Sequence, residues 1–367
     1  MAYKERKELY KKIENKRNRP LICYVTSHRI NASAQMGADV IPEFARHILK
    51  ISKTNKEIDL LIVSMGGDPI VSLRIVSMVR EKFKKFGVIT PFSAYSAATL
   101  VALGADEIVM HPFSNLGPVD PQIVKKIKET KEGKERIVVF SAEDLNHYLE
   151  FVKSDVGITD QEQLEKAFEL ICKDVGAILL SIAKRSSHLS QSLGEKLLSM
   201  HMKEEKNVKA ITEALNKSFY YHGYAVGRKE AKKIGLPVTY PDEELEELLW
   251  EVWQDVSDEM KCNKPFIPLE VVLENEGAKE LISPIEQVQM PTNLQPAVMQ
   301  QIIQNILKQI RVVHINPVDY ELFQSTLESI NCKSDYRTSG KIFARRMPDL
   351  SFSCNTLPIL KGWKKIV

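Results

Sequence analysis

A serine at a tight turn is the first residue in the chain that could do covalent chemistry. Ser96 follows the segment 91–95 and precedes Ala97 and an apolar run that ends at Asp106. If a helix begins here, the Ser96 hydroxyl could cap it by accepting a hydrogen bond from a free backbone N–H. Alternatively, it could be a nucleophile, since nearby N–H groups and the helix dipole can stabilise an oxyanion. This stretch taken alone favours the cap.

Two adjacent glycines, about thirty residues earlier, support the nucleophile interpretation. Gly66 and Gly67 follow the apolar run 58–63 and precede a helix-type segment that begins at Pro69. Glycines at such a junction permit positive φ and leave backbone N–H groups unobstructed, so the loop could donate hydrogen bonds to a carbonyl oxygen. We therefore expect the N–H groups of Gly66, Gly67 and Ala97 to form an oxyanion hole beside Ser96.

A third segment, 115–122, contains two prolines and one glycine, which make it rigid and irregular. It could simply close an edge of a sheet. It could also form a wall of the site near Ser96, and for that role we predict Gly117, Pro118 and Asp120 as substrate-binding residues.

Together these three segments resemble the serine dehydrogenase proteinase family. Its clan also contains the Clp protease subunit, signal peptide peptidase A and the crotonases. The motifs that carry the resemblance stand here at 65–67, 96–110 and 116–122, and it covers roughly residues 5–240. Met65 replaces the family's proline before Gly-Gly, and Ala98 replaces the glycine after Ser-Ala. The resemblance implies an α/β fold with a Clp protease/crotonase-like ββα-superhelix core, a parallel sheet, a helical arm and a C-terminal accessory segment.

The base that would activate Ser96 is left open between a histidine and a lysine, because the clan uses either. His222 belongs to a His-Gly pair of the kind that family members carry at this point. Lys153 lies near the interval in which the lysine-dependent peptidases carry their base. The position of the Clp histidine falls near 119–120, where this chain has none. His111 is closer to Ser96 in sequence, but we expect it at the surface.

Apolar runs alternate with helix-type segments in the first part of the chain. We expect strands at 20–25, 58–63, 87–90 and 107–110, and helices at 2–18, 40–52, 69–85 and after residue 96. Such alternation implies parallel βαβ units with right-handed crossovers, whose sites form at the carboxyl ends of the strands. Both the Gly-Gly pair and Ser96 follow such ends.

The rest of the chain divides at residue 240 in our interpretation. A Clp/crotonase-like serine peptidase domain spans 1–240, and a helical linker with an accessory module spans 241–367. Within the first part, 123–136 is expected as an exposed hairpin or loop, and 161–187 as one helix that either builds an oligomer or packs in the core. The second part has a helix at 297–310 and strand-like runs at 311–314, 342–346 and 363–367.

Composition and charge limit the classes of partner. The 367 residues carry a formal net charge of only +3, from 51 basic and 48 acidic residues, which gives no support for nucleic-acid binding. The five cysteines are scattered, which favours a reducing compartment over disulfides or a zinc site. We find no secretory signal, no transmembrane run and no dinucleotide or pyridoxal-phosphate motif. We therefore expect a cytoplasmic homo-oligomer without metal or cofactor, acting on a peptide or protein.

Three functions fit these observations, and we rank them in this order. The first is a soluble serine endopeptidase that hydrolyses peptide bonds through Ser96. The second is a catalytically degenerate protein that binds a peptide or a partner on the same scaffold, an alternative favoured by Met65, Ala98 and the unassigned base. The third is a crotonase-like acyl-CoA enzyme, which shares the oxyanion geometry but needs no nucleophilic serine.

Overall fold

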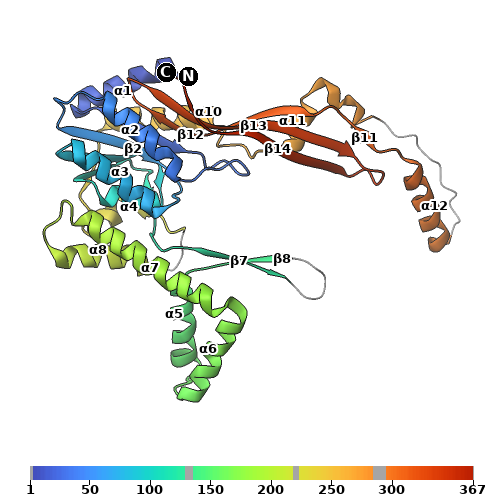
Figure 1. Ribbon diagram of the computed structural model, residues 1–367, viewed down its shortest axis with the longest axis horizontal. Coiled ribbons are helices and arrows are strands. Elements are labelled where there is room, and N and C mark those ends of the chain that lie inside the picture. The colour runs from blue at the N-terminus through green and yellow to red at the C-terminus, as the bar shows by residue number, and fades with distance from the viewer. Residues whose placement is uncertain (1–2, 129–134, 218–222, 284–294, 367) are drawn as a thin grey trace.

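One large sheet organises the structure, a computed structural model that describes residues 3–128, 135–217, 223–283 and 295–366 (Figure 1). The strand order is β10-β5-β3-β2-β1-β12-β13-β11, and β14 pairs with β13. The first five strands of this order run parallel; they are β10 (Val238–Thr239), β5 (Glu107–Met110), β3 (Lys85–Thr90), β2 (Glu57–Val63) and β1 (Leu21–Thr26). The predicted parallel βαβ arrangement is confirmed.

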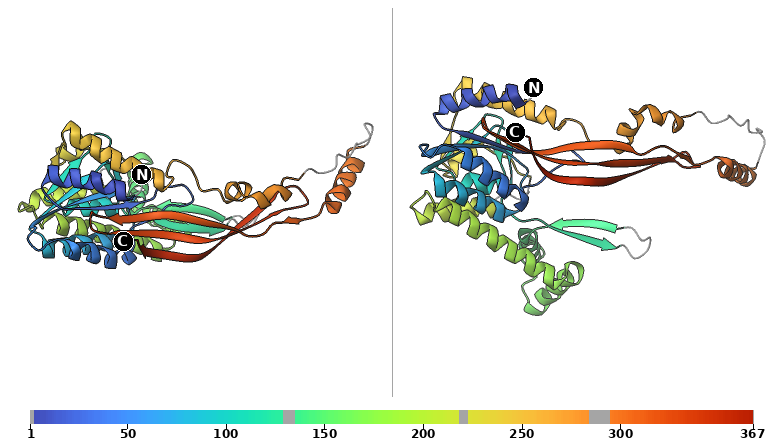
Figure 2. Two further views of the ribbon diagram at one scale, coloured as in Figure 1. Left: turned by 90° about the horizontal axis from the view of Figure 1, so that it is seen from above. Right: turned by 45° about the horizontal axis from the view of Figure 1, so that its top comes forward.

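Helices cover both faces of the parallel strands, because the strands are apolar on both sides. On β1, Ile22 and Tyr24 point into one core, whereas Leu21 and Cys23 point into the other. The first core is closed by α2 (Ile41–Lys50), α3 (Pro69–Lys82), α4 (Ala97–Leu103) and α7 (Ala177–Leu198). The second is closed by α1 (Tyr3–Arg17) and α10 (Glu243–Glu259), which lie side by side in Figure 2.

The last strands of the chain extend this same sheet. Strand β12 (Val318–Glu328) pairs antiparallel with β1, followed by β13 (Lys333–Arg346) and β14 (Phe352–Lys365), while β11 (Val313–His314) pairs with the far end of β13. The long strands project from the body (Figures 1 and 2). Their projecting part is covered on one face by α11 (Pro268–Leu273) and a 3-10 helix (Glu276–Glu280), and α12 (Pro296–Gln309) lies beyond them. Sequence patterns predicted only short strands at 311–314, 342–346 and 363–367 and none over β12, because these strands alternate irregularly between polar and apolar residues.

A hairpin and a helical arm also project from the body; in Figure 1 the hairpin points the same way as the long strands, and the arm points downward. The hairpin is β7 (Ile123–Lys128) and β8 (Glu135–Phe140), as predicted for 123–136. The helix predicted at 161–187 is broken at Gly176, whose φ of +97° ends one helix and starts the next. The arm and the helix after it comprise α5 (Ala142–Glu150), a π-helical turn (Phe151–Asp155), α6 (Gln161–Val175), α7 and α8 (Glu205–Lys217).

Short elements complete the α/β architecture. They are the 3-10 helix η1 (Ala38–Val40), strands β4 (Ser93–Ala94), β6 (Asn115–Leu116) and β9 (Val226–Gly227), and helix α9 (Arg228–Lys233). Strands β4, β6 and β9 form a small separate sheet next to the turn that carries Ser96.

A buried arginine joins the two ends of the chain. The Arg6 side chain is inaccessible to solvent and donates two hydrogen bonds to the Glu328 carboxylate, at 2.9 and 2.7 Å. It also pairs with Asp255 and, at 2.8 Å, with Glu259. These contacts connect α1, α10 and β12, so the N-terminal helix, the helix after the predicted domain boundary and the first long C-terminal strand share one charge network.

Replacing Arg6 with methionine is expected to lower the free energy of unfolding by about 3–5 kcal/mol, because the buried Glu328 carboxylate would lose its two hydrogen bonds from the guanidinium and keep Lys333 and hydroxyl groups as partners. Urea denaturation would measure this change. Lys11→Met on the same helix is the matched control, since its pair with Glu8 is exposed and should contribute less than about 1 kcal/mol. Equal effects of the two substitutions would contradict the prediction.

Acid should destabilise the fold through His47 on α2. This ring is fully buried, and neither of its nitrogens has a hydrogen-bond partner among the described residues. Burial, together with the nearby charge of Arg46, lowers the pKa of His47 from 6.5 to about 4. The unfolded chain therefore binds this proton at higher pH than the folded chain, and stability should fall as pH drops from about 6.5 towards 4. We expect His47→Leu to flatten this part of the stability–pH profile; an unchanged slope in urea titrations would contradict the assignment.

Candidate active site

Ser96 occupies a strained position at the start of α4. Its φ of 52° and ψ of −117° are unusual for a residue with a side chain, and such a backbone costs of order 1–3 kcal/mol. The hydroxyl makes no capping hydrogen bond within the described part of the chain, so the helix-cap interpretation is wrong. A strained turn between a strand and a helix, with a free hydroxyl, is the geometry that exposes a nucleophile.

Buried hydrogen bonds hold this turn in place. The Thr99 hydroxyl donates to the carbonyl of Ala94 at 2.7 Å and accepts the N–H of Gly117 at 3.0 Å. The Ser72 hydroxyl, from α3, donates to the carbonyl of Ala97 at 2.6 Å. The strained backbone is therefore held by a local bond between Thr99 and Ala94 and by tertiary contacts to Ser72 and Gly117.

The Gly-Gly turn lies directly against Ser96. A Cβ atom built on Gly66, whose φ is +102°, would lie 2.7 Å from the Ser96 Cβ and 3.1 Å from the Ala97 nitrogen. The adjacent Gly67 approaches a different neighbour, since its Cβ would lie 2.4 Å from the Met36 carbonyl oxygen. The structure therefore brings together Ser96, Gly66 and Ala97, which sequence reasoning grouped from separate segments.

The three expected oxyanion donors differ in availability. The Gly66 N–H already donates to the Ser64 hydroxyl oxygen at 3.1 Å, and this oxygen also accepts the Thr26 hydroxyl at 2.8 Å. The N–H groups of Gly67 and Ala97 have no acceptor within the described residues. Sequence reasoning overlooked Ser64, although a serine two residues before a glycine turn is a recognisable signal for a side-chain-to-backbone bond.

The segment expected as a wall of the site does lie beside this turn. A Cβ on Gly117 would come within 2.2 Å of the Tyr95 ring, so this glycine packs against the residue before Ser96. Pro118 is buried, and the half-buried Asp120 accepts a hydrogen bond from Gln122 at 3.0 Å.

Of the two proposed bases, the structure describes only Lys153, which does not lie near Ser96. Lys153 is exposed in the π-helical turn of the arm, where it lines a groove with Leu149 and Phe168, away from α4 (Figure 1). His222 lies outside the described residues.

The expectation that His111 lies at the surface is wrong. Its ring is 4% exposed and stacks on Trp250 of α10, with ring centroids 5.2 Å apart. The Phe113 N–H donates to its Nδ1 at 3.1 Å, and burial lowers the pKa of His111 below its usual value. The sequence could not show this, because Trp250 comes from a helix more than a hundred residues later.

Sequence comparisons agree with this geometry. A family model described as ClpP-like SDH-type serine proteinase matches residues 1–132. The uncharacterized protein MJ0137 of Methanocaldococcus jannaschii is 30% identical over 282 residues, which span 75% of this chain and 86% of that protein. The chain belongs to the ClpP-like SDH-type serine proteinase family. Its relatives include a second uncharacterized protein of that organism, MJ1495, 35% identical over 132 residues that cover 34% of this chain and 44% of that one.

Membership makes the family-level function that of a serine proteinase, with peptides as the substrate class. Among solved structures, a mutant of the membrane-bound stomatin-specific protease 1510-N aligns with a TM-score of 0.34 at 16% identity, over 58% of this chain and 79% of that one. Within the described residues, no helix combines the length and the apolar character needed to cross a membrane, and no group of histidine, cysteine and carboxylate side chains could hold a metal.

The close approach of Gly66 to Ser96 gives a direct test. Gly66→Ala would place a methyl group on the Ser96 Cβ at a positive φ, and we expect it to lower the free energy of unfolding by about 2–4 kcal/mol. Urea denaturation measures the effect. Gly227→Ala is the control, because its φ is −71° and nothing lies within 4 Å of the added Cβ. A Gly66→Ala protein as stable as this control would contradict the close contact between Gly66 and Ser96.

Proposed function

We propose that the protein is a serine endopeptidase in which Ser96 attacks the peptide carbonyl. The observation that carries this proposal is the strained backbone of Ser96, which leaves its hydroxyl without a capping bond beside the Gly-Gly turn. Structure of this kind is maintained at a cost in stability and is typical of functional sites. Membership of a serine proteinase family points to the same chemistry.

The N–H groups of Gly67 and Ala97 are the proposed oxyanion hole. Both are free of acceptors within the described residues, and Ala97 additionally begins a helix, whose dipole favours negative charge. Each such donor typically contributes about 10²–10³ to the rate. Gly66 has a different role in this proposal: its N–H is bonded to Ser64, and its missing side chain leaves room for Ser96.

The Ser96 proton needs an acceptor, and His222 and Lys153 both remain candidates. Gly117, Pro118 and Asp120 are proposed to line the substrate cleft, because Gly117 packs on Tyr95 and its N–H reaches Thr99 of the same turn. The proposed peptidase domain is 1–240, which includes all of the residues matched by the family model.

A second candidate function is peptide binding without catalysis. One observation favours it: among the described residues, no histidine, lysine or carboxylate hydrogen-bonds the Ser96 hydroxyl.

Labelling with a fluorophosphonate tests the proposal. This reagent reacts with an activated serine, so we expect the wild-type protein to be labelled and Ser96→Ala to lose at least about 100-fold of the labelling rate. Intact-mass spectrometry would follow the adduct.

Ser93→Ala is the matched control. Ser93 lies on the neighbouring strand β4, and its hydrogen bond with Ser64 is made by its backbone carbonyl, which alanine retains. Absence of labelling in a folded wild-type protein would overturn the peptidase proposal in favour of peptide binding. If the wild type is labelled, comparing His222→Ala with Lys153→Ala would show which of the two supplies the base.

A further inference from the structure

The loop at 33–39 connects the Gly-Gly turn to the last strands of the chain. Met36, at its middle, is buried and pairs with Gly67 as an isolated parallel bridge. The Met36 N–H donates to the Gly66 carbonyl at 2.8 Å, and the Met36 carbonyl accepts the Asp68 N–H at 2.9 Å. Since a Cβ on Gly67 would overlap the Met36 backbone, the two segments touch without any side chain between them.

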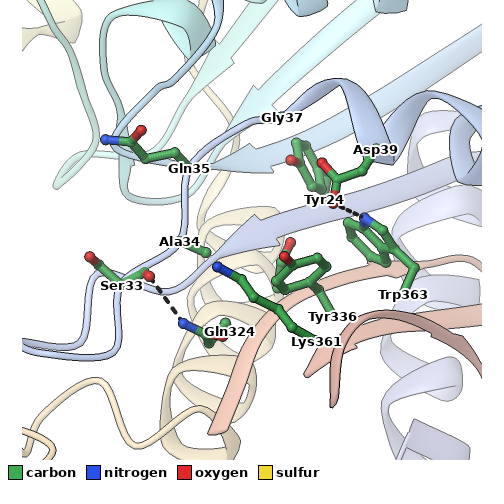
Figure 3. A pocket seen from close by; sticks show the side chains of 11 residues that line it. Tyr24, Ser33, Ala34, Gln35, Gly37, Asp39, Gln324, Tyr336, Lys361 and Trp363 are labelled. Carbon is green, nitrogen blue, oxygen red and sulfur yellow. Dashed lines mark hydrogen bonds between the residues drawn. The ribbon is translucent and has the colours of Figure 1, made fainter. Parts of the chain in front are cut away.

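Both ends of this loop are held by side chains of the C-terminal strands. Gln324 of β12 donates from Nε2 to the Ser33 carbonyl at 3.2 Å, and Trp363 of β14 donates from Nε1 to the Asp39 carboxylate at 3.1 Å. Figure 3 shows these two hydrogen bonds at opposite ends of the loop. Gln324 is itself fixed, because its Oε1 accepts the Thr338 hydroxyl at 2.6 Å.

A cavity separates the middle of the loop from these strands. It has a volume of about 360 Å³ and is lined by Gln35 and Gly37 on the loop side and by Tyr336 and Lys361 on the strand side (Figure 3). The Gln35 and Gly37 part of the loop is therefore separated by this space from Tyr336 and Lys361. The connections at the loop's two ends are these hydrogen bonds, and Trp363 also packs against the buried cluster that contains Met36.

We propose that Trp363 and Gln324 are positioning residues for the Gly66–Gly67 turn and, through it, for the oxyanion hole. The second half of this statement rests on the proposed peptidase function. It gives the C-terminal strands, which lie outside the matched residues 1–132, a direct part in the site. Loss of either contact would let the loop move into the cavity and take the Gly67 N–H away from the position of the oxyanion.

The main test is Trp363→Phe, which keeps an aromatic ring but removes the N–H donor to Asp39. We expect the maximal rate of labelling by the fluorophosphonate to fall about 5- to 20-fold at an unchanged half-saturating concentration, because a displaced donor weakens transition-state stabilisation and leaves probe binding intact. Gln324→Glu, which keeps the acceptor for Thr338 but loses the donor to Ser33, should act in the same direction.

Two comparisons separate positioning from general damage. Asp39→Ala should slow labelling as much as Trp363→Phe does. The double variant should be no slower than either single variant, because all three lack the same hydrogen bond between Trp363 and Asp39. Lys361→Met changes the same strand and the same cavity without touching the loop contacts, and it should label at the wild-type rate. A wild-type rate for Trp363→Phe and Asp39→Ala would overturn the proposal.

Hydrogen exchange tests the positioning role of Trp363 without a measurement of activity. In Trp363→Phe, the backbone amides of residues 33–40 and 64–68 should exchange at least about 3-fold faster than in the wild type and in Lys361→Met. Unchanged exchange at 64–68 would overturn the positioning role even if the wild type is labelled. If the wild type is not labelled, the peptidase proposal fails, while faster exchange at 64–68 still supports positioning of the turn.

Discussion

The contact between Gly66 and Ser96 is the constraint on which the site depends. Any side chain at position 66 would overlap the Cβ of Ser96, so position 66 must be glycine for the serine to lie where it does. The positive φ of both residues then needs external support, which comes from buried hydroxyls at Ser64, Ser72 and Thr99. Small polar side chains, and not charged ones, thus determine where the chemistry can occur.

The parallel part of the fold was predictable because its signals are local. Strands such as β2 are apolar along their whole length, and the glycine and proline residues that end them are explicit in the sequence. Ser96, Gly66 and Ala97 could be grouped for the same reason, since parallel strands place successive carboxyl ends along one edge. The motifs are also specific enough to indicate the family before any comparison.

Features that depend on distant partners were not predictable. The burial of His111 depends on Trp250, and the break at Gly176 depends on a backbone angle that a glycine permits but does not require. The long strands β12 to β14 have no clean alternation because each packs differently along its length. Ser64 could have been noticed from its spacing to Gly66, but its second partner, Thr26, is visible only in the fold.

Pairing of β1 with β12 also affects how the chain folds during synthesis. Strand β1 ends at Thr26, and its partner begins at Val318, so the ribosome must make the whole stretch between them before this edge of the sheet is covered. Until then the nascent protein presents an open edge with apolar faces, a surface prone to pair with other chains. The loop at 33–39, which pairs with the Gly-Gly turn, waits equally long for its contacts with Gln324 and Trp363. A chain released before these strands are made would lack part of the support for its site.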